Sequence, residues 1–182
     1  MRYLSKYFYV ILMALNLAAV ANAQDVIDVS KPVSNPRLTA AMDKLEIEKS
    51  NSAQDSVFSE LNKANYFALA MNFPTPDQTF TSTTQYTLPT GAKFDLLLTG
   101  KDGKKYFLLF TDWDAANKYI ERRHPNEKFK GVIFPSKDAW EFFNGTLASI
   151  CEGIVINPAH NALVLNKRLV NSLLQASKVS KK

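Results

Sequence analysis

The chain has 182 residues, a net charge of +5 and 46 % hydrophobic residues, which is typical of one globular domain. A single Cys excludes an intramolecular disulfide framework and any metal site that needs several cysteines. Two His leave little material for a histidine-based site. We therefore expect no metal, no cofactor and no catalytic residues.

The first residues are typical of an export signal. Arg2 and Lys6 give a basic start, residues 10–20 form an apolar core, and Ala21-Asn22-Ala23 has the small-x-small cleavage pattern. The apolar core is about half of the ~20 residues that a membrane span requires. We therefore predict a signal peptide over residues 1–23 and a mature chain that begins at Gln24. That chain would be periplasmic or secreted, with no integral membrane association after cleavage.

The basic charge is concentrated at the two ends of the chain. Removing the predicted leader lowers the net charge from +5 to +3, and residues 167–182 alone hold five Lys or Arg. Residues 24–166 then carry a net charge of −2. The short basic spot at residues 122–124 is typical of a helix C-terminus, where cations favour the macrodipole. Because nucleic-acid binding needs a concentrated basic face, we expect no nucleic-acid partner.

The first part of the mature chain predicts a linker and two helices. Residues 24–34 are polar and read as a flexible linker. Asn35 followed by proline indicates an N-cap, and apolar residues at helical spacing continue the helix over residues 36–48. A capping box at Ser52-x-x-Asp55 predicts a second helix that ends near Ala64.

Strands follow the helix pair. Residues 66–71 are continuously apolar, which favours a strand buried on both faces. Residues 72–89 hold three Pro and six Thr and predict a long connection with a short strand at residues 83–88. Asp102-Gly103 between apolar runs is a strong hairpin signal. The remaining predicted strands cover residues 93–98, 106–110, 131–134, 153–156 and 162–165.

Helices alternate with these strands. A capping box at Thr111-x-x-Asp114 predicts one helix, Ser136 is expected to cap another, and a last helix carries Leu169. Residues 178–182 form a basic, disordered tail. This order predicts an α/β (α+β) fold: a single compact domain over residues 35–177. We expect a mixed sheet of about five to six strands covered by helices, with an opening helix pair and a C-terminal helix.

The segments and their order resemble the N-terminal domain of the SseB family, named for enhanced serine sensitivity. The resemblance rests on Phe110-Thr111-Asp112-Trp113 at a strand-to-helix corner, on the segment Gly153-Ile154-Val155-Ile156-Asn157-Pro158, and on the opening helix pair with Leu38 and Leu61. It covers residues 35–175 and implies a compact α/β domain. It also implies a protein-interaction module rather than an enzyme. The export signal departs from the cytoplasmic location expected of this family.

Cys151 is the one candidate nucleophile, and His160 follows it across the Asn157-Pro158 turn. A Cys/His pair activates nucleophiles in several enzyme classes, and a sulfurtransferase-like role for Cys151 is one hypothesis. The acidic Glu152 and the apolar strand after it favour instead a small, buried residue at a helix end. After export, the thiol is also available for an intermolecular disulfide.

The candidate binding residues lie at strand ends and on a helix. Asp112 and Asp114 fit the first turn of a helix, where carboxylates cap free N–H groups. An exposed aromatic on the helix after Ser136 would anchor a partner, and residues 72–89 are a second candidate surface. The predicted binding residues are Phe110, Thr111, Asp112, Trp113, Phe142, Asn157 and Pro158.

These observations support two main hypotheses. The first is a non-catalytic exported module that binds another protein, as an accessory to or an inhibitor of a secreted or envelope protein. The second is a small-ligand-binding module that uses the strand ends before Trp113 and Pro158. The Cys151 enzyme is a third, and membrane binding through the basic tail is a weaker fourth. The sequence leaves the partner and the oligomeric state open.

Overall fold

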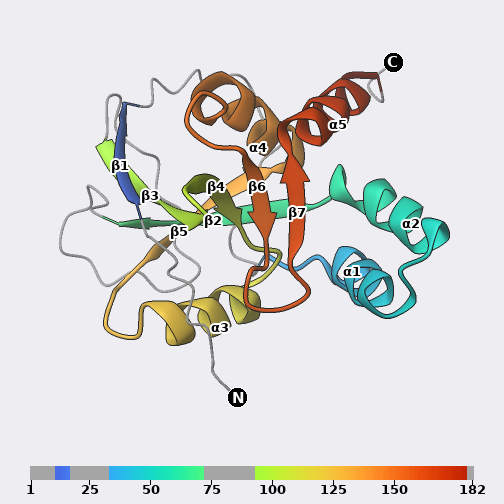
Figure 1. Cartoon of the computed structure of the whole chain (residues 1–182), viewed down its shortest axis with the longest axis horizontal. Helices are drawn as coiled ribbons and strands as arrows, with labels where there is room; N and C mark the ends of the chain where they lie inside the picture. The colour runs from blue at the N-terminus through green and yellow to red at the C-terminus, as the bar shows by residue number, and fades with distance from the viewer. Residues whose placement is uncertain (1–10, 17–32, 72–92, 180–182) are drawn as a thin grey trace.

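A computed structural model describes residues 11–16, 33–71 and 93–179 of the chain, and it contains a mixed sheet with helices on both faces (Figure 1). In chain order the elements are β1 (Ile11–Asn16), α1 (Pro36–Glu48), α2 (Asn51–Leu61), β2 (Asn65–Met71), β3 (Lys93–Lys101), β4 (Lys104–Leu109), α3 (Trp113–Arg123), β5 (Lys130–Pro135), α4 (Ser136–Phe142), a π-helical turn (Phe143–Leu147), β6 (Gly153–Ile156), β7 (Leu163–Asn166) and α5 (Lys167–Val179).

The main path of the sheet has the strand order β5-β2-β3-β4-β6-β7. β4 and β6 run parallel, whereas the other paired strands of the sheet are antiparallel. The parallel pair arises because α3, β5 and α4 lie between β4 and β6 in the chain, as a parallel crossover requires. The predicted α+β domain with a mixed sheet is confirmed, including its opening helix pair and its C-terminal helix.

β1 is a strand that the sequence did not predict. It lies inside the predicted signal peptide and pairs antiparallel with β3, from Ile11 opposite Leu98 to Asn16 opposite Lys93. Cleavage of the leader remains a prediction. The predicted connection at residues 72–89, with its short strand at residues 83–88, lies outside the described residues, as does most of the predicted linker.

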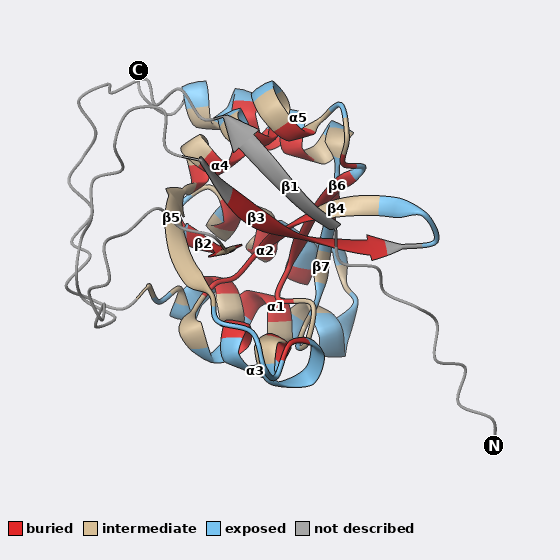
Figure 2. Ribbon diagram, turned by 90° about the vertical axis from the view of Figure 1, so that its left-hand side faces the viewer, coloured by how far each residue is buried: buried red, intermediate tan, exposed pale blue. Residues whose placement is uncertain are grey.

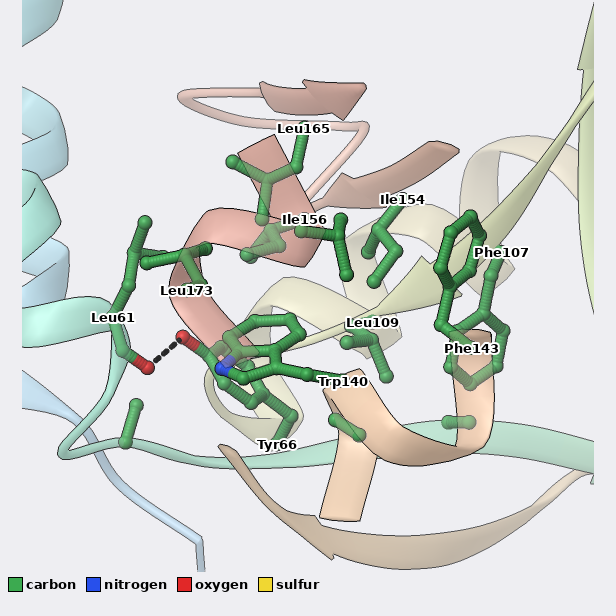
Figure 3. Close-up of a cluster of buried hydrophobic side chains, with 14 of the residues drawn as sticks. Leu61, Tyr66, Phe107, Leu109, Trp140, Phe143, Ile154, Ile156, Leu165 and Leu173 are labelled. Atoms are coloured by element: carbon green, nitrogen blue, oxygen red, sulfur yellow. Dashed lines mark hydrogen bonds between the residues drawn. The ribbon is translucent and has the colours of Figure 1, made fainter. Parts of the chain in front are cut away.

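One face of the sheet is covered by α1, α2, α4 and α5, and we call it the four-helix face. Tyr66, Ala68 and Ala70 of β2 point to this face together with the indole of Trp140 from α4. The rings of Tyr66 and Trp140 have centroids 5.3 Å apart, and the Tyr66 hydroxyl donates to the carbonyl of Leu61 at 2.8 Å (Figure 3). These large side chains are fully buried and form the main core.

The opposite face is covered by one described helix, α3, and we call it the α3 face. Phe67 and Leu69 of β2 point this way, where they meet Phe110 and Tyr119. The strand β2 is therefore buried on both faces, as its continuous apolar sequence predicted. Figure 2 shows its residues buried at the centre of the molecule.

The helix starts differ from the predicted capping boxes by one or two residues. Ser50 caps α2, with its side chain accepting from the amide of Ala53, so the predicted cap at Ser52 is wrong. Asp112 caps α3 in place of Thr111. Ser136 is the first residue of α4 rather than its cap. The starts of α2 and α3 offer capping side chains at neighbouring positions, which explains the shift there. At α4 the residue before Ser136 is Pro135, which makes no side-chain cap bond.

The β3–β4 hairpin is confirmed. Asp102 and Gly103 form its turn with φ values of 52° and 76°, and Lys101 pairs with Lys104 on either side. Two successive residues with positive φ define the turn type that matches the twist of paired strands. The Asp-Gly pair permits this turn because glycine adopts positive φ without a steric cost.

Candidate functional site

The predicted site residues other than Phe142 converge where the parallel strands β4 and β6 end. In open α/β sheets, the carboxyl ends of parallel strands are a common place for a ligand. Leu109 is the last residue of β4, and its carbonyl accepts from the amide of Asn157 at 3.1 Å, directly after β6. The segments that hold Thr111 and Asn157 therefore meet at one corner of the sheet, and we call it the polar corner.

Asn157 is the centre of the polar corner. Its Oδ1 accepts from the amide of Thr111 at 3.1 Å, and its Nδ2 donates to the Thr111 hydroxyl at 2.8 Å. The residue has a φ of 51° and only 2 % of it is exposed. Asn tolerates the left-handed region better than most residues because its side chain bonds locally. Asn157 therefore both turns the chain and joins β6 to the segment after β4.

Thr111 extends the polar corner into α3. Its hydroxyl donates to Oδ2 of Asp112 at 2.8 Å, and Oδ1 of Asp112 accepts from the amide of Ala115 at 2.8 Å. The carboxylate thus caps the helix, as its expected place in the first turn indicated. Both oxygens of Asp112 and the hydroxyl of Thr111 are engaged within the fold.

Asn35 completes the polar corner, although the sequence indicated only a helix cap. Its side chain makes no cap hydrogen bond. Instead Nδ2 donates to the carbonyls of Thr111 and Asn65, both at 2.7 Å, and Oδ1 accepts from the amide of Asn65 at 3.0 Å. The start of α1 is thereby joined to β2 and to the strand-to-helix corner. This role depends on contacts between distant segments, so local sequence carries no signal for it.

The turn between β6 and β7 contacts α1. Nδ2 of Asn161 donates to Oδ1 of Asp43 at 2.6 Å, and Nε2 of His160 lies 3.7 Å from the same oxygen. His160 is exposed, and its pair with Asp43 is open to water, which limits the stabilisation that the contact provides. Pro158 is half-buried in the same turn.

The proposed Cys/His pair is not brought together. Cys151 precedes β6 and His160 follows it, so the two residues flank opposite ends of this strand. Cys151 is fully buried in the core of the four-helix face. Burial raises the pKa of its thiol to about 11, which disfavours the nucleophilic thiolate.

His124 is a buried histidine at the C-terminal end of α3. Its Nδ1 lies 3.0 Å from Oε1 of Glu127, and its ring packs between Tyr119 and Phe129. Its Nε2 is buried without a hydrogen-bond partner in the described structure. The basic spot of Arg122 and Arg123 is the last turn of α3, as the sequence predicted.

The predicted aromatic binding residues lie on opposite faces of the sheet. Phe110 and Trp113 belong to the α3 face, where Trp113 is half-buried and its ring centroid lies 4.5 Å from that of Phe67. Phe142 belongs to the four-helix face. It is half-buried against Phe107 and Phe134, with centroids 5.8 and 5.4 Å away, rather than exposed as predicted.

In residues 11–16, 33–71 and 93–179, no three His, Cys, Asp or Glu side chains are grouped to hold a metal ion. Within the same ranges, no helix has both the length and the apolar character needed to cross a membrane.

The comparisons with known proteins agree with the resemblance. The protein-family model of the SseB protein N-terminal domain matches residues 38–172 of this chain. This chain belongs to the SseB family. The matched region of this SseB domain begins in α1 and ends in α5, so it includes both faces of the sheet and all of the polar corner except Asn35. Searches of curated proteins and of solved structures gave no match.

Proposed function

We propose that this SseB-family chain is an exported, non-catalytic module that binds another protein, as an accessory to or an inhibitor of a secreted or envelope protein. The observation that carries the proposal is the α3 face. Its aromatic side chains Tyr106, Trp113 and Phe129 pack on the core but are only half-buried. Large aromatic side chains of this kind are the usual anchors of protein interfaces.

The geometry of the polar corner favours protein binding over small-ligand binding. A ligand site presents polar groups that converge on an open space. At the polar corner, the side chains of Thr111, Asp112 and Asn157 bond to one another and to the backbone. These residues hold the strand ends together, and the α3 face beside them is left to contact a partner.

The environment of Cys151 supports a non-catalytic role. A reactive cysteine needs an exposed, electropositive surrounding that lowers its pKa. Cys151 is buried, and burial raises its pKa instead. A buried thiol at the end of a helical segment is explained by packing alone.

The proposal is tested by locating the mature protein and identifying what it binds. A C-terminal tag, cell fractionation and mass spectrometry of the N-terminus would show an exported chain that begins at Gln24. Crosslinking before purification would then recover one enriched partner. Trp113→Ala should abolish this enrichment, because it removes an aromatic anchor from the α3 face.

Phe142→Ala is the matched control, because Phe142 is a half-buried aromatic on the other face. Thermal unfolding of both variants would check that they remain folded. Loss of the partner with Trp113→Ala and retention with Phe142→Ala supports the proposal. Equal loss with both variants, or a wild-type chain that recovers no partner, contradicts it. An uncleaved chain in the cytoplasm contradicts the export part.

A further inference from the structure

The strand β3 is covered on two edges by different parts of the chain. Leu98 pairs with Phe107 of β4 and also with Ile11 of β1, so β1 and β4 lie on opposite edges of β3 at this residue. β2 joins the same edge as β4 through Ala70 and Met71. Figure 1 shows β1 beside β3 at the margin of the sheet. We call residues 93–98, on the side that β1 covers, the β3 outer edge.

The occupant of the β3 outer edge lies within the predicted leader. All of β1 precedes the predicted cleavage site after Ala23. Cleavage would remove this strand, and the backbone N–H and C=O groups that face β1 along the β3 outer edge would lose it as their pairing strand. An unpaired strand edge is a template for pairing with another chain.

The β3 outer edge has little of the protection that natural edges carry. Prolines, bulges and charged residues usually prevent unwanted pairing. Residues 93–98 contain no proline. Their charged residues, Lys93 and Asp95, stand in the first half of the segment, and the uncharged run Leu96, Leu97 and Leu98 follows in the middle of β3. The paired length is six residues on each strand, enough for a continuous ladder.

We propose that the β3 outer edge of the cleaved protein binds an extended apolar segment of its partner, antiparallel, in the place of β1. The sequence of β1 indicates what kind of partner segment fits this edge. β1 has the sequence Ile-Leu-Met-Ala-Leu-Asn, which has no charge and no proline. Strand addition of this kind takes its affinity from backbone hydrogen bonds and its specificity from alternate side chains. The proposal rests on the protein-binding function above and adds to the α3 face a second contact with the same partner.

In the uncleaved precursor, β1 would compete with any such segment. A strand tethered to the same chain has an effective concentration on the order of millimolar. The leader would therefore keep the β3 outer edge occupied until cleavage. Binding of the partner would begin only in the mature protein.

The test uses a fluorescent peptide with the sequence of residues 10–17, Val-Ile-Leu-Met-Ala-Leu-Asn-Leu. Fluorescence anisotropy measures its binding to the mature chain that begins at Gln24, after circular dichroism has shown that this chain is folded. We expect saturable binding, and hydrogen exchange should slow at residues 93–98. The matched control is the same peptide with Ala14→Pro, which removes a backbone donor and distorts the strand. It should bind about tenfold more weakly or worse.

The precursor with its leader in place is the second control, and it should bind the peptide at least about tenfold more weakly than the mature chain. Equal binding of the proline peptide, or equal binding by the precursor, overturns the proposal. A mature chain that dimerises through residues 93–98 and excludes the peptide also overturns it, because a second copy then occupies the edge. Failure of the peptide to bind while a partner is still recovered overturns strand addition alone. Peptide binding with no partner recovered overturns the protein-binding function instead.

Discussion

The two faces of the sheet differ in how many side chains they bury. Within the described residues, half-buried aromatics occur on both faces, but more of the fully buried side chains lie on the four-helix face. On the four-helix face, Tyr66, Trp140 and Phe143 lose all contact with solvent. On the α3 face, Trp113 and Phe129 pack against the core and remain half-buried. Apolar area removed from water stabilises the fold, whereas apolar area left exposed is available to a partner. The first face therefore supplies most of the stability, and the second leaves a larger share of its apolar side chains partly exposed to a partner.

The largest expected effect is on the four-helix face. Trp140→Ala removes a fully buried indole and leaves Oδ1 of Asn62 without the bond that Nε1 of Trp140 donates at 2.8 Å. We expect a loss of about 3–5 kcal/mol in the free energy of unfolding, because a large cavity is left behind. Urea unfolding followed by circular dichroism measures it.

Trp113→Ala is the matched change on the α3 face. Its indole is half-buried over Phe67 and Gly131, so we expect a loss of only about 1–2 kcal/mol. Equal losses for the two tryptophans would show that the two faces contribute alike to stability, and the comparison above would be wrong.

The next effect lies at the polar corner, where the two faces meet. Asn157→Ala removes three side-chain bonds, to the amide and hydroxyl of Thr111 and to Asn161, and places alanine at a φ of 51°. We expect a loss of about 2–3 kcal/mol, since a buried amide loses its partner and the backbone is strained. Urea unfolding at neutral pH measures this loss.

Asn157→Gly separates the two causes, because glycine loses the same bonds without the strain. It should be about 1 kcal/mol more stable than Asn157→Ala. If the two variants are equally stable, the backbone conformation of Asn157 contributes nothing. If neither variant is destabilised, the polar corner does not hold β4 and β6 together.

Local signals predicted much of this fold. Helix α1 has the bounds that proline and apolar spacing indicated, residues 36–48, and the Asp102-Gly103 turn forms the expected hairpin. Such features depend on residues close together in the chain. The ligand-binding hypothesis named the strand ends before Trp113 and Pro158, and the structure brings Thr111, Asp112 and Asn157 together there.

Contacts between distant segments could not be predicted in the same way. The Asn35 side chain bonds to Thr111, and no periodicity connects residues so far apart. The pairing of β1 with β3 was missed for a different reason. Residues 10–20 are apolar, and an apolar run near the N-terminus fits an export signal as well as a strand. The same apolar residues meet the requirements of an export signal and those of a strand, and only the structure shows the strand.

The last expected effect concerns the buried thiol of the four-helix face and is confined to high pH. Burial raises the pKa of Cys151 from its ordinary value of 9.0 to about 11. The folded state therefore holds the proton more tightly than the unfolded state. This contribution to stability is complete below pH 9 and is lost as the pH rises to about 11. Unfolding free energies measured across this range should fall by about 2 kcal/mol more for the wild type than for Cys151→Ala.

Comparison with Cys151→Ala isolates the thiol, because other groups titrate in the same range. Burial also raises the pKa of Tyr66 and of Tyr119, and both tyrosines are present in the wild type and in the variant. Their contributions cancel in the difference between the two curves. Parallel curves would mean that the Cys151 thiol ionises as readily in the folded chain as in the unfolded one. The thiol would then ionise near its ordinary pKa of 9.0, and the sulfur chemistry that its burial disfavours would again need to be considered.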